Sequence, residues 1–228
     1  AKYVISPQVI GTDDAAKIKD ACKYDAVDLD MQAKTMDLAV GAIVWATGWE
    51  PYDAHRIDNL GFGQYDNIIT NMMLERLASN NGPTKGKIVR PSDDKAPESV
   101  AFVQCAGSRD ENHLPYCSYI CCMASLKHAT YIREQYPDTK VYIFYIDIRS
   151  PGDRYEKFYN KIKEDENVIF IKGKVAEVSE DPSTKNITVV AENAVTGEKT
   201  RQTVDMVVLA TGMQPTAANT KLPADLKI

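Results

Sequence analysis

The sequence predicts an α/β fold, with a parallel sheet of the nucleotide-binding type followed by an antiparallel meander. Two observations predict it. Between residues 99 and 171 apolar, strand-like runs alternate with helical stretches, which is the order of a β-α-β-α-β unit with a parallel sheet. Residues 174–204 then alternate apolar and polar positions between turn sequences, a pattern typical of antiparallel strands with one face in water.

The elements of this region follow in order along the chain. Runs rich in apolar, β-branched and aromatic residues predict parallel strands at Val100–Gln104, Val141–Ile146 and Val168–Ile171. Helical spacing of apolar residues predicts the intervening helices at Tyr116–Tyr136 and Pro151–Asp165. The meander strands are expected at Lys174–Val178, Ile187–Ala191 and Lys199–Val204.

The part before residue 99 is less regular. The apolar run that starts at Ala42 and is closed by Gly and Pro predicts a strand buried on both faces. Shorter strands are expected at Tyr3–Ile5 and Val27–Met31, and helices at Asp13–Cys22 and Asn71–Ser79. Residues 52–70 look irregular, and 80–98, rich in Gly, Pro, Lys and Asp, predict a loop or linker.

The composition is that of a soluble globular chain. Of its 228 residues 44% are hydrophobic and 26% charged, which excludes wholesale disorder. The net charge is −5 and there is no long Lys/Arg block, so we expect no nucleic-acid partner. No apolar run reaches the length of a membrane span and no signal peptide is visible, so we expect a cytoplasmic protein with no direct membrane span. The start at Ala1 and the abrupt end at Ile228 suggest a fragment.

Two segments share one sequence pattern: an apolar run, Ala-Thr-Gly, two further residues and Pro. They end at Pro51 and Pro215. Small residues at the carboxyl end of a parallel strand let the backbone approach a ligand closely, and open α/β sheets bind ligands at that end. The alternative is a buried strand followed by an ordinary turn. The candidate cofactor-binding residues are Thr47, Gly48, Thr211 and Gly212.

Over residues 36–215 this arrangement resembles flavoproteins with two dinucleotide-binding domains, the glutathione and thioredoxin reductase class. The resemblance implies that the four candidate residues lie near FAD in an intact protein. It implies a partial FAD domain and linker at 36–98, a second nucleotide-type domain at 99–204, and a return strand and tail at 205–228, after a segment at 1–35. No G-x-G-x-x-G turn is present, so we do not expect this chain to retain FAD by itself. Asp147 stands where a ribose-binding carboxylate would lie, and without the glycine turn we interpret it as a relic or a salt-bridge partner.

The cysteines point to a metal or redox site. An odd, clustered set without an export signal argues against a disulfide framework. If the helix begins by Cys117, then Cys117 and Cys121 share one of its faces, with the end of the strand at Cys105 beside them. The helix dipole would stabilise a negatively charged [4Fe–4S] cluster, and Arg109 and Lys127 could add to that. The candidate ligands are Cys105, Cys117, Cys121 and Cys122.

Other interpretations of the cysteines stay open. Structural zinc prefers spaced cysteine pairs, which adjacent Cys121 and Cys122 fit poorly. A redox disulfide or plain buried thiols are further alternatives. His113 lies in the same segment, but a single loop histidine is more often solvated, so we do not count it as a ligand.

Five motifs resemble the A subunits of heterodisulfide reductases: residues 103–110, 116–118, 121–123, 144–149 and 155–159. Those proteins carry FAD and iron–sulfur clusters, and one cluster is held by cysteines in this unusual spacing. The resemblance therefore implies the same four cysteine ligands. It also implies an electron-transfer subunit of a multi-subunit oxidoreductase, in which the cofactors supply the chemistry, so we assign no catalytic side chain.

The segment around Cys22 resembles the end of a ferredoxin-type cluster motif, but its partner cysteines are absent. This degenerate site and the sequence at 48–52 together resemble the A subunits of quinone-interacting membrane-bound oxidoreductase complexes of sulfate reducers. The implied partners are other redox subunits, including a membrane-bound quinone-reactive one. Two alternatives are a pyridine-nucleotide:disulfide reductase that attacks through Cys121 or Cys122, and a non-catalytic docking module with a structural metal site.

Overall fold

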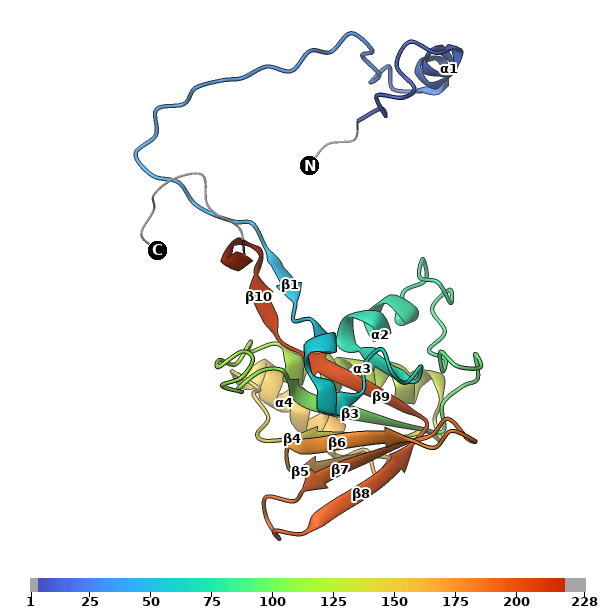
Figure 1. Ribbon diagram of the computed structural model, residues 1–228, viewed down its shortest axis with the longest axis vertical. Helices are drawn as coiled ribbons and strands as arrows, with labels where there is room; N and C mark the ends of the chain where they lie inside the picture. Colours follow the sequence, from blue (N-terminus) through green and yellow to red (C-terminus); the bar gives the residue numbers. More distant parts are fainter. Residues whose placement is uncertain (1–3, 220–228) are drawn as a thin grey trace. The chain divides into compact units, whose positions relative to one another are not determined.

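The computed structural model describes residues 4–219, which belong to two compact units, Ala1–Ala46 and Thr47–Ile228 (Figure 1). The described part of the first unit has one helix, α1 (Asp13–Ala21), and residues 31–46 have no regular structure. The strands expected at Val27–Met31 and from Ala42 are therefore wrong. Val44 is 89% exposed, because no strand of the described residues pairs with this segment. Of the strand expected at Tyr3–Ile5, Tyr3 lies outside the described residues and the other two residues form no strand.

The second unit is built on a five-stranded parallel sheet in the order β2-β9-β3-β4-β5 (Figure 1). Its strands are β2 (Ile68–Thr70), β3 (Ser99–Ala106), β4 (Lys140–Tyr145), β5 (Val168–Lys172) and β9 (Met206–Thr211). The helices are α2 (Asn71–Ala78), α3 (Cys121–Gln135) and α4 (Asp153–Lys163). This topology, with the meander below, confirms the predicted α/β class.

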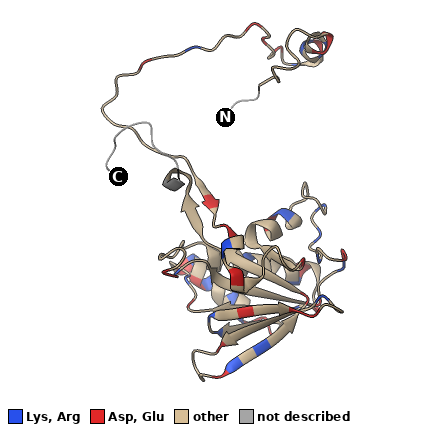
Figure 2. Cartoon of the chain, viewed as in Figure 1, with Lys and Arg blue, Asp and Glu red and all other residues tan. Residues whose placement is uncertain are grey.

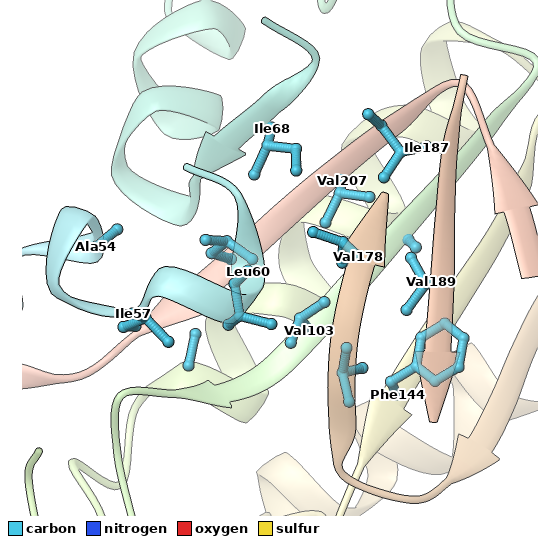
Figure 3. Packing of buried hydrophobic residues seen from close by; sticks show 14 of the residues in the cluster. Ala54, Ile57, Leu60, Ile68, Val103, Phe144, Val178, Ile187, Val189 and Val207 are labelled. Atoms are coloured by element: carbon cyan, nitrogen blue, oxygen red, sulfur yellow. The ribbon is translucent and has the colours of Figure 1, made fainter. Parts of the chain in front are cut away.

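A core lies on each face of the sheet because both faces of its strands are apolar. On β3, Val100 and Phe102 pack toward the helices, against Leu126 and Ile132 of α3. The alternate residues of the strand face the other way, and Val103 belongs to the core with the meander. Figure 3 shows that second core, with further side chains from the three-residue 3₁₀ helices Ala54–Arg56 and Asp58–Leu60.

The meander forms a separate three-stranded antiparallel sheet in the order β6-β7-β8. Its strands are β6 (Val175–Glu180), β7 (Ile187–Glu192) and β8 (Lys199–Val204). Ile187 and Val189 are fully buried, whereas Lys199 and Arg201 of β8 are exposed. Figure 2 shows blue segments, which mark Lys and Arg, along β8. The alternation of buried and exposed residues confirms the prediction that one face of the meander is in contact with water.

Two details differ from the sequence prediction. The helix expected from Tyr116 begins at Cys121, because Tyr119 has φ +58° and interrupts the helical backbone. The stretch 52–70, expected to be irregular, contributes the edge strand β2, whose three residues are too few for a periodic signal.

The second apolar run with Ala-Thr-Gly ends inside this sheet. β9 lies between β2 and β3, and after it the chain leaves the sheet as β10 (Met213–Pro215). β10 pairs antiparallel with β1 (Trp49–Pro51), the one part of the run from Ala42 that forms a strand, and the 3₁₀ turn Thr216–Asn219 follows. The segments that follow the two Ala-Thr-Gly sequences therefore lie side by side in a two-stranded ribbon.

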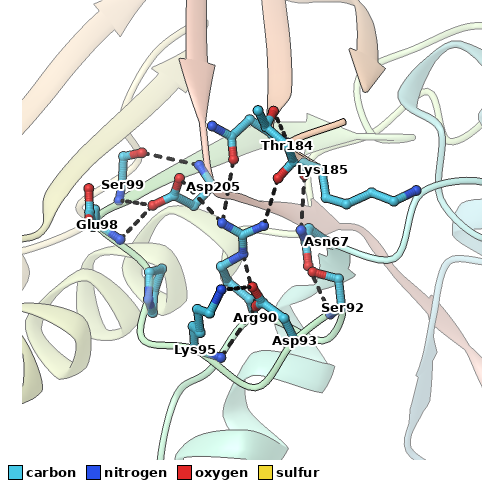
Figure 4. Close-up of polar contacts among 12 residues, drawn as sticks. Asn67, Arg90, Ser92, Asp93, Lys95, Glu98, Ser99, Thr184, Lys185 and Asp205 are labelled. Atoms are coloured by element: carbon cyan, nitrogen blue, oxygen red, sulfur yellow. Dashed lines mark hydrogen bonds and ion pairs between the residues drawn. The ribbon is translucent and has the colours of Figure 1, made fainter. Parts of the chain in front are cut away.

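An ionic network fixes the start of the central strands (Figure 4). The Asp205 carboxylate accepts hydrogen bonds from the backbone N–H groups of Glu98 (2.6 Å) and Ser99 (3.0 Å). It also pairs with Arg90 at 3.7 Å, and both side chains are 13% exposed. Arg90 in turn donates to the backbone oxygen of Thr184 (3.2 Å), so the network joins the loop 80–98 to the meander.

Candidate metal centre

Three of the clustered cysteines lie at the carboxyl ends of adjacent parallel strands. Cys105 is the last residue but one of β3, whose Ala106 pairs with Thr211 of β9. Cys121 Sγ lies 3.4 Å from the backbone oxygen of Thr211. Cys122 Sγ lies 3.8 Å from the backbone oxygen of Asp147, just after β4. The start of α3 thus places two thiols over the strand ends where the third one lies.

The backbone at Cys105 is unusual. Cys105 has φ +57°, a left-handed conformation that is costly for a residue with a Cβ, and it falls at a bulge where the register between β3 and β9 shifts. Ser108 N–H donates to the Cys105 oxygen at 3.1 Å and closes the turn. Gly107 is required there, since its φ is +72° and a Cβ would lie 2.6 Å from the Tyr52 ring.

Cys117 reaches the same place from a loop. Two backbone hydrogen bonds close that loop onto the turn: Leu114 N–H to the Gly107 oxygen at 2.9 Å, and Arg109 N–H to the Tyr116 oxygen at 3.1 Å. Cys117 therefore lies before α3, and the predicted shared helix face with Cys121 is wrong. The cysteines come together through a closed loop, whose geometry spacing alone does not give.

The four thiols are close enough to influence one another. Burial, together with the charges of neighbouring thiols, raises the pKa of Cys105 to about 11 and that of Cys121 to about 12. Burial also raises the pKa of Cys122. All are free thiols. With their pKa values raised, Cys121 and Cys122 are poor nucleophiles, which argues against a disulfide reductase that attacks through either of them.

The arrangement of the cysteines bears on which kind of metal group they could hold. Among the described residues no group of three or more His, Cys, Asp or Glu is placed to hold a metal ion. A zinc ion needs its sulfurs about 2.3 Å from one point. A cubane instead binds each thiolate at a different iron, so it suits thiols that surround a common space at wider separation.

Buried polar groups without partners lie near the cysteines along the chain. Both amide atoms of Gln104 are buried and make no hydrogen bond, and the same holds for the hydroxyls of Ser108 and Ser125. Gln104 follows Phe102 by two residues, so it lies on the face of β3 that packs against α3, where Ser125 is buried one turn after Cys121. Such groups are rare unless a ligand or water meets them, so the residues present fit a bound sulfur-rich group.

Charged side chains lie at one edge of the cluster. Arg109 Nη1 donates to Asp147 Oδ1 at 2.9 Å, and Arg149 holds both oxygens of the same carboxylate. The interpretation of Asp147 as a salt-bridge partner is confirmed. Lys127, considered with Arg109 in the sequence, pairs instead with Glu75 at 2.7 Å.

The candidate flavin residues fall in two places. Thr211 is buried and donates to Asn71 at 3.1 Å, and a Cβ on Gly212 would collide with the hydroxyl of Ser108. Thr47 and Gly48 lie at the ribbon, where Thr216 donates to the Thr47 oxygen at 2.8 Å. A groove of about 310 Å³ lies at the ribbon, lined by Gly48, Trp49, Tyr116, Cys117, Ser118, Met213, Gln214 and Pro215.

Sequence reasoning missed several groups at this site. Gln104 and Ser108 flank Cys105, and a polar side chain inside an otherwise apolar strand was the available signal for Gln104. His113, set aside as a solvated residue, accepts or donates a 2.8 Å hydrogen bond with the Tyr52 hydroxyl. Nothing in the local sequence predicts that contact, because the two residues are 61 positions apart.

Comparison with known proteins finds relatives that are similar over most of this chain. It is 45% identical over 192 residues to one of the two iron-sulfur A subunits of CoB–CoM heterodisulfide reductase in Methanopyrus kandleri, covering 84% of this chain and 29% of that protein. It is 44% identical over 203 residues to the iron-sulfur A subunit of the same enzyme in Methanocaldococcus jannaschii, covering 89% of this chain and 31% of that protein. Over most of its length the chain is therefore similar in sequence to A subunits of heterodisulfide reductases. It spans less than a third of the length of these relatives.

The other comparisons add little to this. No family model matches the chain. Among solved structures, thioredoxin reductase from Giardia duodenalis is similar with a TM-score of 0.46 and 15% identity, covering 77% of this chain and 45% of that chain. The thioredoxin reductase of T. acidophilum gives a TM-score of 0.42 and 15% identity, covering 75% and 44%. Among residues 4–219 no helix is long and apolar enough to cross a bilayer.

Proposed function

We propose that this chain is part of a flavin and iron–sulfur electron-transfer subunit of a multi-subunit oxidoreductase. Its four clustered cysteines hold a [4Fe–4S] cluster. The observation that carries the proposal is the meeting of Cys105, Cys121 and Cys122 at the ends of β3, β9 and β4, with Cys117 in the loop closed onto them. The sequence similarity supports it, since relatives are named as iron-sulfur subunits.

The protein supplies binding, charge and exclusion of water. Four thiolates give the site net negative charge, which the free N–H groups at the start of α3 and the Arg109 guanidinium stabilise. Buried strand ends beneath the thiols keep water away and lower the local dielectric constant. When bound, the cluster supplies one-electron transfer, and no side chain of the chain acts as acid, base or nucleophile.

In the whole protein, FAD lies near Thr47, Gly48, Thr211 and Gly212 and exchanges electrons with the cluster. The groove that Gly48 shares with Cys117 supports this, because it connects the ribbon to the cysteine loop. The partners are other redox subunits, one of them membrane-bound and quinone-reactive, as in sulfate reduction. The cytoplasm is the proposed location, since free thiols and iron–sulfur clusters persist in reducing compartments.

Anaerobic reconstitution of the 228-residue chain with iron and sulfide tests the cluster. We expect about four irons and four sulfides per chain, an EPR signal on reduction, and no stoichiometric flavin absorbance. Cys117→Ala should lose most of the iron. Cys22→Ala is the matched control, because Cys22 lies in the other compact unit, and it should keep all the iron. A chain that binds no iron, or equal loss in both variants, contradicts the proposal.

A further inference from the structure

Arg109 lies just after the turn that follows Cys105 at the end of β3. It lies four residues after Cys105, and its backbone has φ +54°, with its N–H bonded to the Tyr116 oxygen. The guanidinium reaches the end of β4 and donates to Asp147 Oδ1 at 2.9 Å. With only 26% of the side chain exposed, the position of this cation is fixed by both backbone and ion pair.

Asp147 connects this ion pair to a second cysteine. Its backbone oxygen lies 3.8 Å from Cys122 Sγ, and its carboxylate is also bonded by Arg149 at 2.9 and 3.2 Å. The Arg109 side chain also contacts the Cys105 thiol, and the Arg109–Asp147 pair is closed at 2.9 Å. A cation and a carboxylate of opposite sign therefore both lie beside the cysteines.

We propose that the Arg109–Asp147 ion pair sets the reduction potential of the cluster, with Arg109 as the positioning cation that favours the reduced state. This inference rests on the proposed [4Fe–4S] site. Reduction adds one electron and breaks or forms no bond, so the reduced site carries one more negative charge than the oxidised one. A fixed cation at the thiolates stabilises that extra charge, and a fixed carboxylate destabilises it.

The test is a redox titration of the iron-loaded chain followed by EPR. Arg109→Gln should shift the potential to more negative values, by up to about tenfold in the one-electron equilibrium constant, or about 59 mV. Arg109→Lys keeps the charge and should restore most of the original potential. Asp147→Asn removes the opposing charge with little change in shape and should shift the potential to more positive values.

Arg149→Gln is the matched control. Arg149 bonds the same carboxylate, but its side chain is 42% exposed and it contributes only its backbone N–H to Cys122, which the variant keeps. We expect a smaller shift than for Arg109→Gln. If Arg109→Gln loses its iron, the positive shift of Asp147→Asn decides the question. Potentials unchanged in a chain that holds about four irons overturn this inference alone, whereas a chain without iron overturns the proposed function.

Discussion

Asp205 is a residue outside the cysteine site whose replacement should destabilise the fold. Its carboxylate accepts the N–H groups of Glu98 and Ser99 at 2.6 and 3.0 Å and pairs with the largely buried Arg90. Asp205→Ala removes all three contacts. A hydrogen bond to a charged group contributes about 1.5–3 kcal/mol. Because Glu98 is exposed, we take the lower end for the two bonds, which gives about 3 kcal/mol.

Urea unfolding of the 228-residue chain, followed by circular dichroism, measures this loss. Asp93→Ala is the control. Asp93 pairs with the same Arg90 at 3.3 Å and with Lys95, but its side chain is 29% exposed and sits at the outer side of the network. A solvent-exposed pair of this kind contributes much less than the two bonds of Asp205. The reasoning is refuted if Asp205→Ala loses less than the control, or if both variants unfold at the urea midpoint of the unchanged chain.

Three further predictions concern other groups of the described chain. Cys105→Gly should stabilise the iron-free chain in urea relative to Cys105→Ala by about 1 kcal/mol, because Gly adopts the left-handed backbone without steric cost; equal stability would contradict the strain. Gln104→Leu should stabilise the iron-free chain by about 1 kcal/mol, because it removes unpartnered buried polar atoms, yet it should lower the iron retained after desalting. Burial lowers the pKa of His128 in the folded chain below the unfolded value of about 6.5, so the stability that it contributes is present above about pH 6.5 and is lost as the pH falls toward the folded pKa. Urea midpoints at about pH 7.5 and about pH 5.5 should therefore differ more for the unchanged chain than for His128→Gln, and equal differences would count against this assignment.

The parts that the sequence predicts well are those with strong local patterns. The β-branched run at 141–146 and the amphipathic stretch at 151–165 appear as β4 and α4, because periodicity there follows burial. Prediction failed where a segment depends on a partner strand: Ile43 and Val44 are apolar but exposed, since no strand among the described residues pairs with them. It also failed for the order of the sheet, since β2 and β9 are adjacent although far apart in the chain, and no local signal encodes that pairing.

For the candidate site, the cysteine types and their clustering were readable, but the way they meet was not. The argument from an i, i+4 helix face fails for Cys117 and Cys121, because Tyr119 lies between them with a left-handed backbone and α3 begins only at Cys121. What brings Cys117 to the others is a pair of backbone hydrogen bonds between the loop and the turn after β3. Such closures depend on which N–H and oxygen groups are left unpaired after the sheet has formed, and a linear pattern does not record them.

Several unfavourable features of this fold lie around Cys105. Cys105 keeps a left-handed backbone that glycine would adopt at lower cost, and its neighbours Gln104 and Ser108 bury polar atoms without partners. Elsewhere on β3, Val100, Phe102 and Val103 are apolar and buried, so the strand itself does not require these costs. A thiol at 105 and polar groups beside it are therefore better explained by something that the site binds than by folding, and a sulfur-bound cluster that accepts hydrogen bonds would offset both kinds of cost.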